Sequence, residues 1–305
     1  MPNIGVVGAG HVGVSCARGL ARDGLVTRLT IYDRTAAHAE GEVLDLAQAG
    51  PLLEPSELRG RGLDALEPED VLIVTTGAHT EPGQTRLDLL RANLAVLEEV
   101  AVAAERDALP KVCLVVSSPL DVLTEYLTRR WADQPVNVMG SGTALDTWRL
   151  AEELATVCEV HPEAVHAWVV GEHGDSSVVL FNSATVAGMP LADFASQTGV
   201  DLSPARLAAV ADDVRTAAYR VRQLKGATWH AIGLTVNELV RAMVREPGRI
   251  VPVSVRVAEE VCASLPCVLG PDGPGPPLRP PMDDGERTAW EHSLAVLREA
   301  LAALP

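Results

Sequence analysis

The residue in this chain that is best suited to chemistry is a histidine that lies between two glycines. His173 lies between Gly171 and Gly174 and follows an apolar run over residues 164–170, so we expect it on a turn after a buried strand. An imidazole titrates near neutral pH and can donate or accept a proton during a reaction. The alternative is a turn histidine without a chemical role.

A carboxylate and a guanidinium lie three residues apart in the segment 142–149. Asp146 and Arg149 would share one face of a helix if a helix already runs there. If Asp146 is hydrogen-bonded to the far ring nitrogen of His173, it would orient the imidazole and raise the pKa of the histidine. A planar guanidinium such as that of Arg149 can bind both oxygens of a carboxylate. The alternative is an ordinary ion pair on the surface of the helix.

A glycine-rich segment, Gly-Ala-Gly-His-Val-Gly over residues 8–13, points to a bound dinucleotide. It directly follows an apolar strand and opens a helix. Its glycines allow a tight turn and let a pyrophosphate approach the helix N-terminus. Asp33 lies 20 residues after Gly13, where it would accept hydrogen bonds from ribose hydroxyls and repel a 2′-phosphate. NAD is therefore favoured, although the neighbouring Arg34 leaves NADP open.

The first half of the chain alternates short strands with helices. This alternation predicts a parallel sheet with helices on both faces. We predict an α/β fold in which an N-terminal Rossmann domain, a doubly wound parallel sheet over residues 1–141, precedes a C-terminal α+β lobe over residues 142–305. The predicted strands are 4–7, 28–32, 71–75 and 112–116, and the predicted helices are 10–22, 36–48 and 86–106.

The second half favours longer helices joined to short strands. An alanine-rich helix is expected over residues 204–223, and a final helix is expected to bury one apolar face. The proline- and glycine-rich residues 270–277 cannot sustain a helix or a central strand, so a surface connection is predicted there. The apolar face of the final helix consists of Trp290, Leu294, Leu297 and Leu301.

Composition disfavours several kinds of partner. A formal charge of −16 disfavours nucleic acid and anionic membranes, because both require a basic face. Neither a secretory leader nor an apolar stretch of about 18 residues is visible, so no membrane span is expected. The five cysteines, an odd number within mostly apolar runs, indicate reduced thiols and a cytoplasmic location. Cys262 and Cys267 lack further zinc ligands nearby, and no metal site is predicted.

Seven groups of motifs occur in one order along the chain. They are residues 8–13 with Asp33, 41–46, 76–78 with 82–86, 116–124, 140–149, 171–175 and 225–228. With these motifs the chain resembles the L-lactate/malate dehydrogenase family over essentially its whole length, and most closely the L-lactate dehydrogenase branch.

The resemblance implies an NAD-dependent L-2-hydroxy acid dehydrogenase that interconverts a small 2-oxo acid and its L-2-hydroxy acid. It also implies a homodimer or homotetramer. The implied catalytic residues are His173, Asp146 and Arg86. His173 donates the proton, Asp146 orients the imidazole of His173, and Arg86 is a cation on a mobile loop. The implied substrate contacts are Arg149, Thr80, Ser118 and Thr228. The implied cofactor contacts are Gly8, Gly10, Val12, Gly13, Asp33, Gly77, Ala78 and Ser118.

Three of these positions bear on the substrate. Thr80 stands where the family usually has glutamine or arginine, so a second carboxylate of a malate-type substrate has no evident partner and a bulkier side chain could fit. Ser118 replaces the usual asparagine, whereas Thr228 matches the residue beside the pyruvate methyl group. Pyruvate and L-lactate are therefore favoured. The alternatives are a bulkier or hydroxylated 2-oxo acid, and a protein that binds NADH without turnover.

Overall fold

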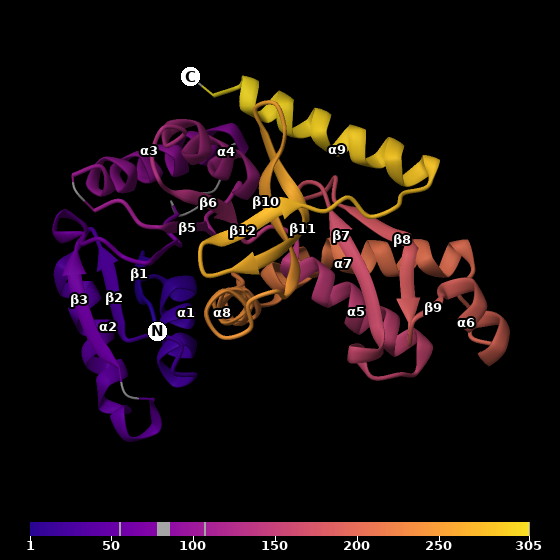
Figure 1. Cartoon of the computed structure of the whole chain (residues 1–305), viewed down its shortest axis with the longest axis horizontal. Coiled ribbons are helices and arrows are strands. Elements are labelled where there is room, and N and C mark those ends of the chain that lie inside the picture. Colours follow the sequence, from indigo (N-terminus) through magenta and orange to yellow (C-terminus); the bar gives the residue numbers. More distant parts are fainter. Residues whose placement is uncertain (55, 78–85, 107, 305) are drawn as a thin grey trace.

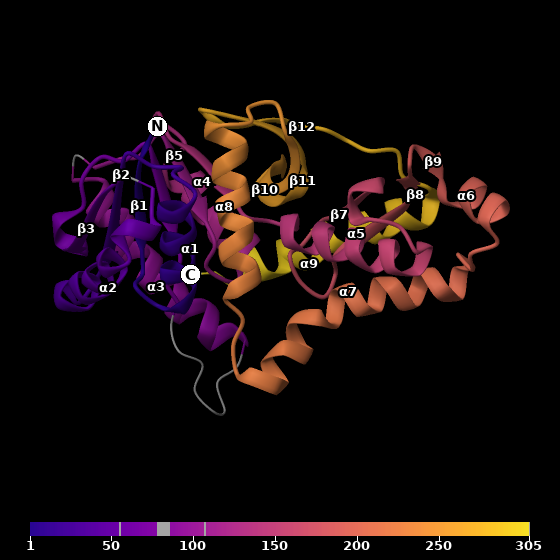
Figure 2. The same cartoon turned by 90° about the horizontal axis from the view of Figure 1, so that it is seen from below.

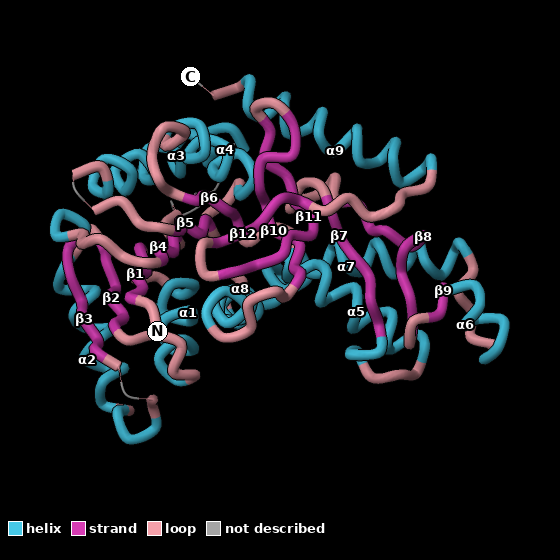
Figure 3. Tube along the Cα trace, in the orientation of Figure 1, coloured by secondary structure: helices cyan, strands magenta, loops and turns pink. Residues whose placement is uncertain are grey.

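The computed structural model describes residues 1–54, 56–77, 86–106 and 108–304, and of residues 86–89 the backbone alone. These residues form a nine-stranded sheet with helices on both faces, and a three-stranded antiparallel sheet with its own helices (Figure 1). Figure 3 distinguishes helices, strands and loops, and shows β3 at one outer end of the large sheet.

Six parallel strands form the first half of the large sheet, in the spatial order β3-β2-β1-β4-β5-β6. Because the strand order reverses between β1 and β4, their carboxyl ends flank the crevice where sheets of this type bind ligands. The strands are β1 (Asn3–Val7), β2 (Arg28–Asp33), β3 (Glu57–Gly62), β4 (Val71–Val74), β5 (Val112–Val115) and β6 (Asn137–Gly140). The helices between them are α1 (His11–Arg22), α2 (Ala36–Gln48), α3 (Arg86–Ala104) and α4 (Leu120–Arg130).

The predicted parallel sheet is confirmed, and its four predicted strands agree with the structure to within one residue at each end. Strand β3 is not predicted by the sequence pattern, because Glu57–Gly62 contains arginines and glycines rather than alternating apolar residues. β3 lies at the edge of the sheet and pairs with β2 alone. An edge strand can keep charged side chains in water, so it does not need an apolar pattern.

The second half of the chain extends this sheet. β10 pairs antiparallel with β6, where Ser254 faces Gly140, and β11 and β12 follow outward. The added strands are β10 (Ile250–Ala258), β11 (Val261–Gly270) and β12 (Gly273–Pro277), and the small sheet contains β7 (Val165–Val170), β8 (Val178–Val186) and β9 (Met189–Pro190). The helices are α5 (Ala144–Cys158), α6 (Leu191–Thr198), α7 (Pro204–Lys225), α8 (His230–Val244) and α9 (Asp284–Ala302). Since the large sheet crosses residue 141, the domain boundary at residues 141 and 142 stays a prediction.

The prediction of a surface connection over residues 270–277 was wrong. Residues Gly273–Pro277 form β12, which pairs with β11 through Leu269 and Pro274. β12 is the other edge of the nine-stranded sheet. A proline lacks an N–H, and the outer side of an edge strand has no neighbour that would need this donor.

Helix α8 joins the second half of the chain to the first. α8 and α1 lie side by side on one side of the sheet, with α3 and α4 on the other (Figures 1 and 2). Their contact depends on glycine: a Cβ on Gly19 would lie 1.6 Å from the Asn237 side chain, and one on Gly233 would lie 2.2 Å from the Ser15 hydroxyl. The two helices therefore approach more closely than larger residues would allow.

Two apolar clusters form the interior. The larger one includes the parallel strands and the buried face of α9, whose four predicted residues are all buried. The smaller one lies between the small sheet and helices α5 to α7, and includes Leu150, Val169 and Val214. Among the described residues, no helix is both long and apolar enough to cross a membrane.

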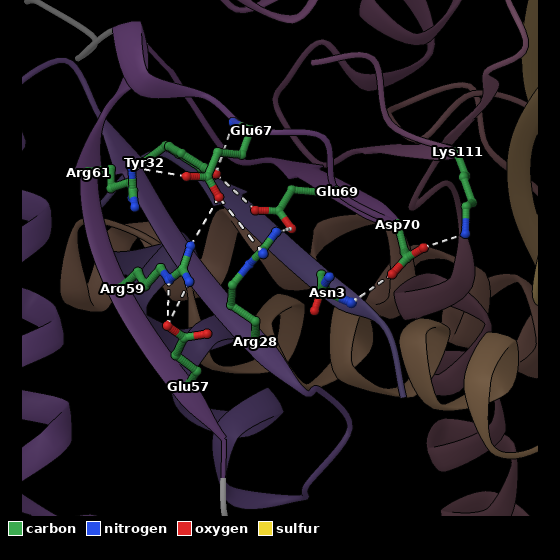
Figure 4. Close-up of polar contacts among 10 residues, drawn as sticks. All are labelled: Asn3, Arg28, Tyr32, Glu57, Arg59, Arg61, Glu67, Glu69, Asp70 and Lys111. Atoms are coloured by element: carbon green, nitrogen blue, oxygen red, sulfur yellow. Dashed lines mark hydrogen bonds and ion pairs between the residues drawn. The ribbon is translucent and has the colours of Figure 1, made fainter. Parts of the chain in front are cut away.

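A polar cluster surrounds Glu69 next to strands β2 and β3 (Figure 4). The side chain of Glu69 is fully buried and accepts hydrogen bonds from Arg28 and from the Tyr32 hydroxyl, both at 2.9 Å. Burial, and then the charge of Glu69, raise the pKa of Tyr32, so its hydroxyl stays a donor. At the nearby edge strand, Arg59 pairs with the half-exposed Glu57 at 2.7 Å.

We expect the variant Glu69→Ala to lower the free energy of unfolding by about 3 kcal/mol, because Arg28 and Tyr32 lose a buried acceptor. Urea unfolding followed by circular dichroism would measure this loss. The matched control Glu57→Ala removes an exposed ion pair and should cost about 0 to 1 kcal/mol. Equal losses in the two variants would contradict the buried role of Glu69.

Candidate active site

The turn after β7 carries His173. β7 ends at Val170, and Gly171 then adopts a φ of +87°, which side-chain-bearing residues rarely take. A Cβ on Gly171 would also lie 2.5 Å from the Ser293 hydroxyl. Glycine is therefore required where the chain leaves the strand, and the predicted glycine-flanked turn is confirmed.

Asp146 joins His173 to Arg149. Its Oδ2 lies 2.7 Å from Nδ1 of His173, and its Oδ1 accepts a hydrogen bond from Nη1 of Arg149 at 2.8 Å. The Asp146 side chain is 11% exposed, compared with 20% for Arg149 and 30% for His173. Since Asp146 occupies Nδ1, the other ring nitrogen, Nε2, is the one that can act on a substrate.

The surroundings of His173 favour its protonated form. Burial alone would lower the pKa of His173, but the charge and hydrogen bond of Asp146, together with the charge of Asp121, outweigh it and raise the pKa. Burial alone would raise the pKa of Asp146, but His173 and Arg149 lower it. Both pKa shifts therefore favour an imidazolium beside a carboxylate over the neutral pair.

Three other elements hold the turn through its backbone. The N–H of His173 donates to Asp121 of α4 at 2.8 Å, and the preceding N–H donates to Ser293 of α9 at 2.8 Å. Gly171 and Ser264 of β11 exchange two backbone hydrogen bonds, of 3.0 and 2.8 Å. The position of the histidine thus depends on α4, α5, α9 and β11 together.

A cavity of about 350 Å³ lies in front of this turn. Four predicted site residues line it together: Ser118, Asp146, Arg149 and His173. The remaining lining residues are Pro119, Glu172, Gly174, Asp175, Ser177, Arg215, Ala218, Tyr219 and Arg222. A carboxylate, an imidazole and a guanidinium thus converge on a space large enough for a small organic acid.

Helix α7 contributes two arginines to this cavity that the sequence analysis missed. Arg215 and Arg222 line the same cavity as Arg149. They lie seven residues apart, which is about two helical turns, so they share one face of α7. Within the described part of the chain, neither one forms an ion pair with a carboxylate. The spacing is visible in the sequence, but only the fold shows which face of α7 meets the cavity.

Four other predicted residues are not among the described residues that line this cavity. Ala78 and Thr80 lie outside the described residues. Arg86 begins α3, and its side chain is not described. Thr228 lies between α7 and α8 and is not among the described residues that line the cavity.

The glycine segment forms the turn between β1 and α1. Gly8 has a φ of +105°, and a Cβ on Gly13 would lie 1.9 Å from the carbonyl oxygen of Gly8. Gly10 is the N-cap of α1, and a Cβ there would meet nothing within 4 Å. Val12 lies in the first turn of α1 and packs against the core. The open N-terminus of α1 therefore fits a pyrophosphate.

Asp33 ends β2 beside this turn. It accepts hydrogen bonds from the backbone N–H groups of Ala9 and Thr35, both at 3.0 Å. Arg34 forms two hydrogen bonds of 2.8 Å with Glu99, which compensates its charge. A carboxylate at the strand end beside a neutralised arginine suits the ribose of NAD better than the phosphate of NADP.

Gly77 and Ser118 follow β4 and β5 and lie at the same edge of the sheet as the glycine turn. The carbonyl of Ser118 accepts a hydrogen bond from the Asn93 side chain at 2.6 Å. This contact ties the segment after β5 to α3. Ser118 lines the cavity next to His173.

An aromatic stack beside the glycine turn is a second feature that sequence reasoning missed. The ring of His11 stacks on Trp229 with centroids 4.6 Å apart, and the ammonium of Lys225 lies 3.3 Å from the centre of the same indole. His11, Trp229 and Gly10 line a cavity of about 490 Å³. Among the described residues, no group of three or more His, Cys, Asp or Glu side chains could hold a metal ion.

Comparisons with known proteins agree with this geometry. Residues 2–140 match the lactate/malate dehydrogenase NAD binding domain, and residues 143–304 match the lactate/malate dehydrogenase alpha/beta C-terminal domain. The chain is 37% identical to an L-lactate dehydrogenase of Synechococcus sp. (strain JA-3-3Ab), with 98% of both chains covered. It is also 37% identical to an L-lactate dehydrogenase of Thermus aquaticus, with 99% of both covered.

Solved structures show the same likeness. The minor L-lactate dehydrogenase from Enterococcus mundtii superposes with a TM-score of 0.90 at 28% identity, covering 99% of this chain and 98% of that one. A lactate dehydrogenase from a deep-sea metagenome library superposes with a TM-score of 0.91 at 30% identity, covering 99% of each chain. The chain belongs to the lactate/malate dehydrogenase family. It combines an NAD-binding Rossmann domain, which the sequence predicted, with a C-terminal α/β domain.

The variant Asp146→Asn removes the charge that raises the pKa of His173. We expect kcat/KM for reduction of a 2-oxo acid to fall about 100-fold or more at neutral pH, because less of the imidazole is protonated and its orientation is loosened. The alkaline limb of the pH profile, which reports loss of the proton from His173, should move to lower pH. Asp175→Asn, in the same cavity but paired with Tyr219, is the control and should leave this limb in place. An unshifted limb in Asp146→Asn would contradict the assignment.

Proposed function

We propose that this chain is an NAD-dependent L-lactate dehydrogenase that interconverts pyruvate and L-lactate. The observation that carries the proposal is the carboxylate of Asp146, which bonds His173 and Arg149 at 2.7 and 2.8 Å at the wall of one cavity. Full-length relatives named L-lactate dehydrogenase support it. A protein that only binds NADH would need neither a paired histidine nor an arginine beside it.

His173 acts as the acid in reduction and as the base in oxidation. When bound, NADH supplies the hydride that is delivered to the carbonyl carbon of pyruvate. The imidazolium of His173 gives its Nε2 proton to the carbonyl oxygen, so pyruvate, one hydride and one proton become lactate. In the reverse direction, neutral His173 takes the hydroxyl proton. Asp146 holds the ring in the required orientation and stabilises the charged form.

Arg149 binds the carboxylate of the substrate. Its contact with Asp146 fixes the guanidinium before the substrate arrives. A planar guanidinium can bind both carboxylate oxygens, which sets the angle at which the carbonyl meets His173. We assign Arg86 as the cation that polarises the carbonyl, and Thr80, Ser118 and Thr228 as the residues near the substrate.

The N-terminal half binds NAD. We assign the pyrophosphate to the N-terminus of α1, where Gly10 leaves open space, and the ribose to Asp33. The other cofactor contacts that we propose are Gly8, Val12, Gly13, Gly77, Ala78 and Ser118.

We also infer that two or four copies of the chain associate in the cytoplasm. Exposed apolar side chains occur on α2, α7 and α8, among them Leu44, Leu224 and Leu234, which are 66%, 89% and 65% exposed. Apolar side chains this exposed favour a surface covered by a second copy. The five free, buried cysteines suit a reducing compartment.

Substitution of the histidine tests the proposed reaction. We expect His173→Gln to lower pyruvate-dependent oxidation of NADH by about 1,000-fold, because no acid remains for the carbonyl oxygen. NADH binding, measured by fluorescence titration, should change little, since the glycine turn is intact. His166→Gln, an exposed histidine of β7, is the control and should keep full turnover. Unchanged turnover in His173→Gln would rule out the acid and base role.

A second candidate substrate is a 2-oxo acid with an anionic or hydroxylated side chain. Arg215 and Arg222 favour it, because they line the cavity of Arg149 and form no ion pair with a carboxylate of the described residues. Thr80 offers no positive charge to a second carboxylate. The two cations of α7 provide a partner for one.

A panel of 2-oxo acids assayed with NADH separates the two substrates. If α7 binds an anionic side chain, Arg222→Met should lower kcat/KM for a dicarboxylic 2-oxo acid by about tenfold and leave pyruvate nearly unchanged, because one surface-exposed charge contact is lost. Arg220→Met, on the same helix but paired with Asp213, is the control. A native preference for pyruvate of about 100-fold, unaltered in Arg222→Met, would exclude the second candidate.

A further inference from the structure

Asp121 is a buried carboxylate to which the sequence analysis assigned no role. It lies in the first turn of α4 and is 2% exposed. Its Oδ2 accepts a hydrogen bond from the backbone N–H of His173 at 2.8 Å, and its Oδ1 accepts one from the Ser254 hydroxyl at 2.6 Å. Both oxygens therefore have a partner, and one of these partners is the catalytic turn itself.

The surroundings of Asp121 are mostly apolar. A cavity of about 210 Å³ adjoins Asp121. Apart from Glu172 and His173, the other residues that line this cavity are apolar, among them Leu90, Leu120 and Leu297. Apolar walls exclude water, and a charge that water does not screen acts strongly on its neighbours. Burial raises the pKa of Asp121 to about 6, while the hydrogen bonds from Ser254 and His173 and the charge of His173 oppose that rise. Both oxygens accept hydrogen bonds, as those of a carboxylate do, and a pKa of about 6 leaves most of the group charged at neutral pH.

We propose that Asp121 is a positioning residue for the reaction, which holds the backbone of His173 in place and adds a second negative charge that favours the proton-donating imidazolium. Asp146 holds the ring, and Asp121 holds the main chain. The histidine is thus fixed at two points by two carboxylates from two helices, α4 and α5. This inference rests on the proposed function, since it assumes that His173 delivers the proton.

The negative charge of Asp121 is needed because Arg149 lies next to Asp146 and His173. Asp146 shares its negative charge with Arg149, whose positive charge opposes protonation of His173. The charge of Asp121 raises the pKa of His173 and so acts against the effect of Arg149. Glu172 is the other carboxylate near Asp121. The negative charge of Asp121 therefore offsets the lowering of the His173 pKa by Arg149. The chain can keep a cation for the substrate carboxylate next to an acid that must also be cationic.

The variant Asp121→Asn tests this assignment without removing the contacts. The amide oxygen can accept the N–H of His173, and the amide nitrogen can donate to the Ser254 hydroxyl, so the charge is removed while the geometry is kept. We expect the pKa of His173, measured by proton NMR titration of its imidazole in the cofactor-free protein, to fall by about one unit. The alkaline limb of kcat/KM for pyruvate reduction should move to lower pH by the same amount.

Ser293→Ala is the matched control. It removes the neutral anchor from the N–H of Glu172 and loosens the same turn, so turnover should fall while the pKa of His173 stays in place. If Asp121→Asn does not fold, Ser254→Ala serves instead. Loss of that hydroxyl makes Asp121 easier to protonate, and the pKa of His173 should fall by a smaller amount.

Three results would overturn the inference. They are an unchanged pKa of His173 in Asp121→Asn, an equal fall in Ser293→Ala, and a fall in pKa without any shift of the kinetic limb. The NMR titration needs no substrate. If no 2-oxo acid is turned over and yet the pKa shifts, the proposed function fails while the electrostatic link between Asp121 and His173 stands.

Discussion

The contact on which the rest of the structure depends is the carboxylate of Asp146 between His173 and Arg149. A nearly buried charge is tolerated only when its hydrogen bonds and counter-charges are complete, because an unpaired one costs several kcal/mol. The first turn of α5 and the turn after β7 must therefore meet within hydrogen-bonding distance. Gly171, which no side-chain-bearing residue replaces without strain, makes that meeting possible.

The two halves of the chain supply different parts of one reaction centre. The parallel strands present the glycine turn and Asp33 at their carboxyl ends, while α5 and β7 present the acid and the arginine. These parts keep their relative positions because β10 extends the first-half sheet at β6 and α8 packs closely on α1. The segment around Ser118 belongs to the first half but lines the cavity of the second, so it links the two.

The sequence predicted four of the six parallel strands, because their side chains are apolar on both faces, which is a local signal. It did not predict β3, β6 or β12. β6 is only four residues long, and β3 and β12 lie at the two edges of the sheet, where a strand with arginine or proline needs no partner on its outer side. Asp121 and the arginines of α7 were also missed. Asp121 meets His173 across 52 residues of sequence, and no pattern within either segment indicates that contact.

The sequence by itself determined the chemistry that is available: an imidazole between glycines, a carboxylate three residues before an arginine, and a glycine turn followed by Asp33. Residue types and short spacings carry that information, because helix and turn geometry are local. Only the tertiary structure decided which charges meet. The protonation of His173 depends on Asp146, Asp121 and Arg149 together, and electrostatic energy follows distance and burial in space rather than separation along the chain.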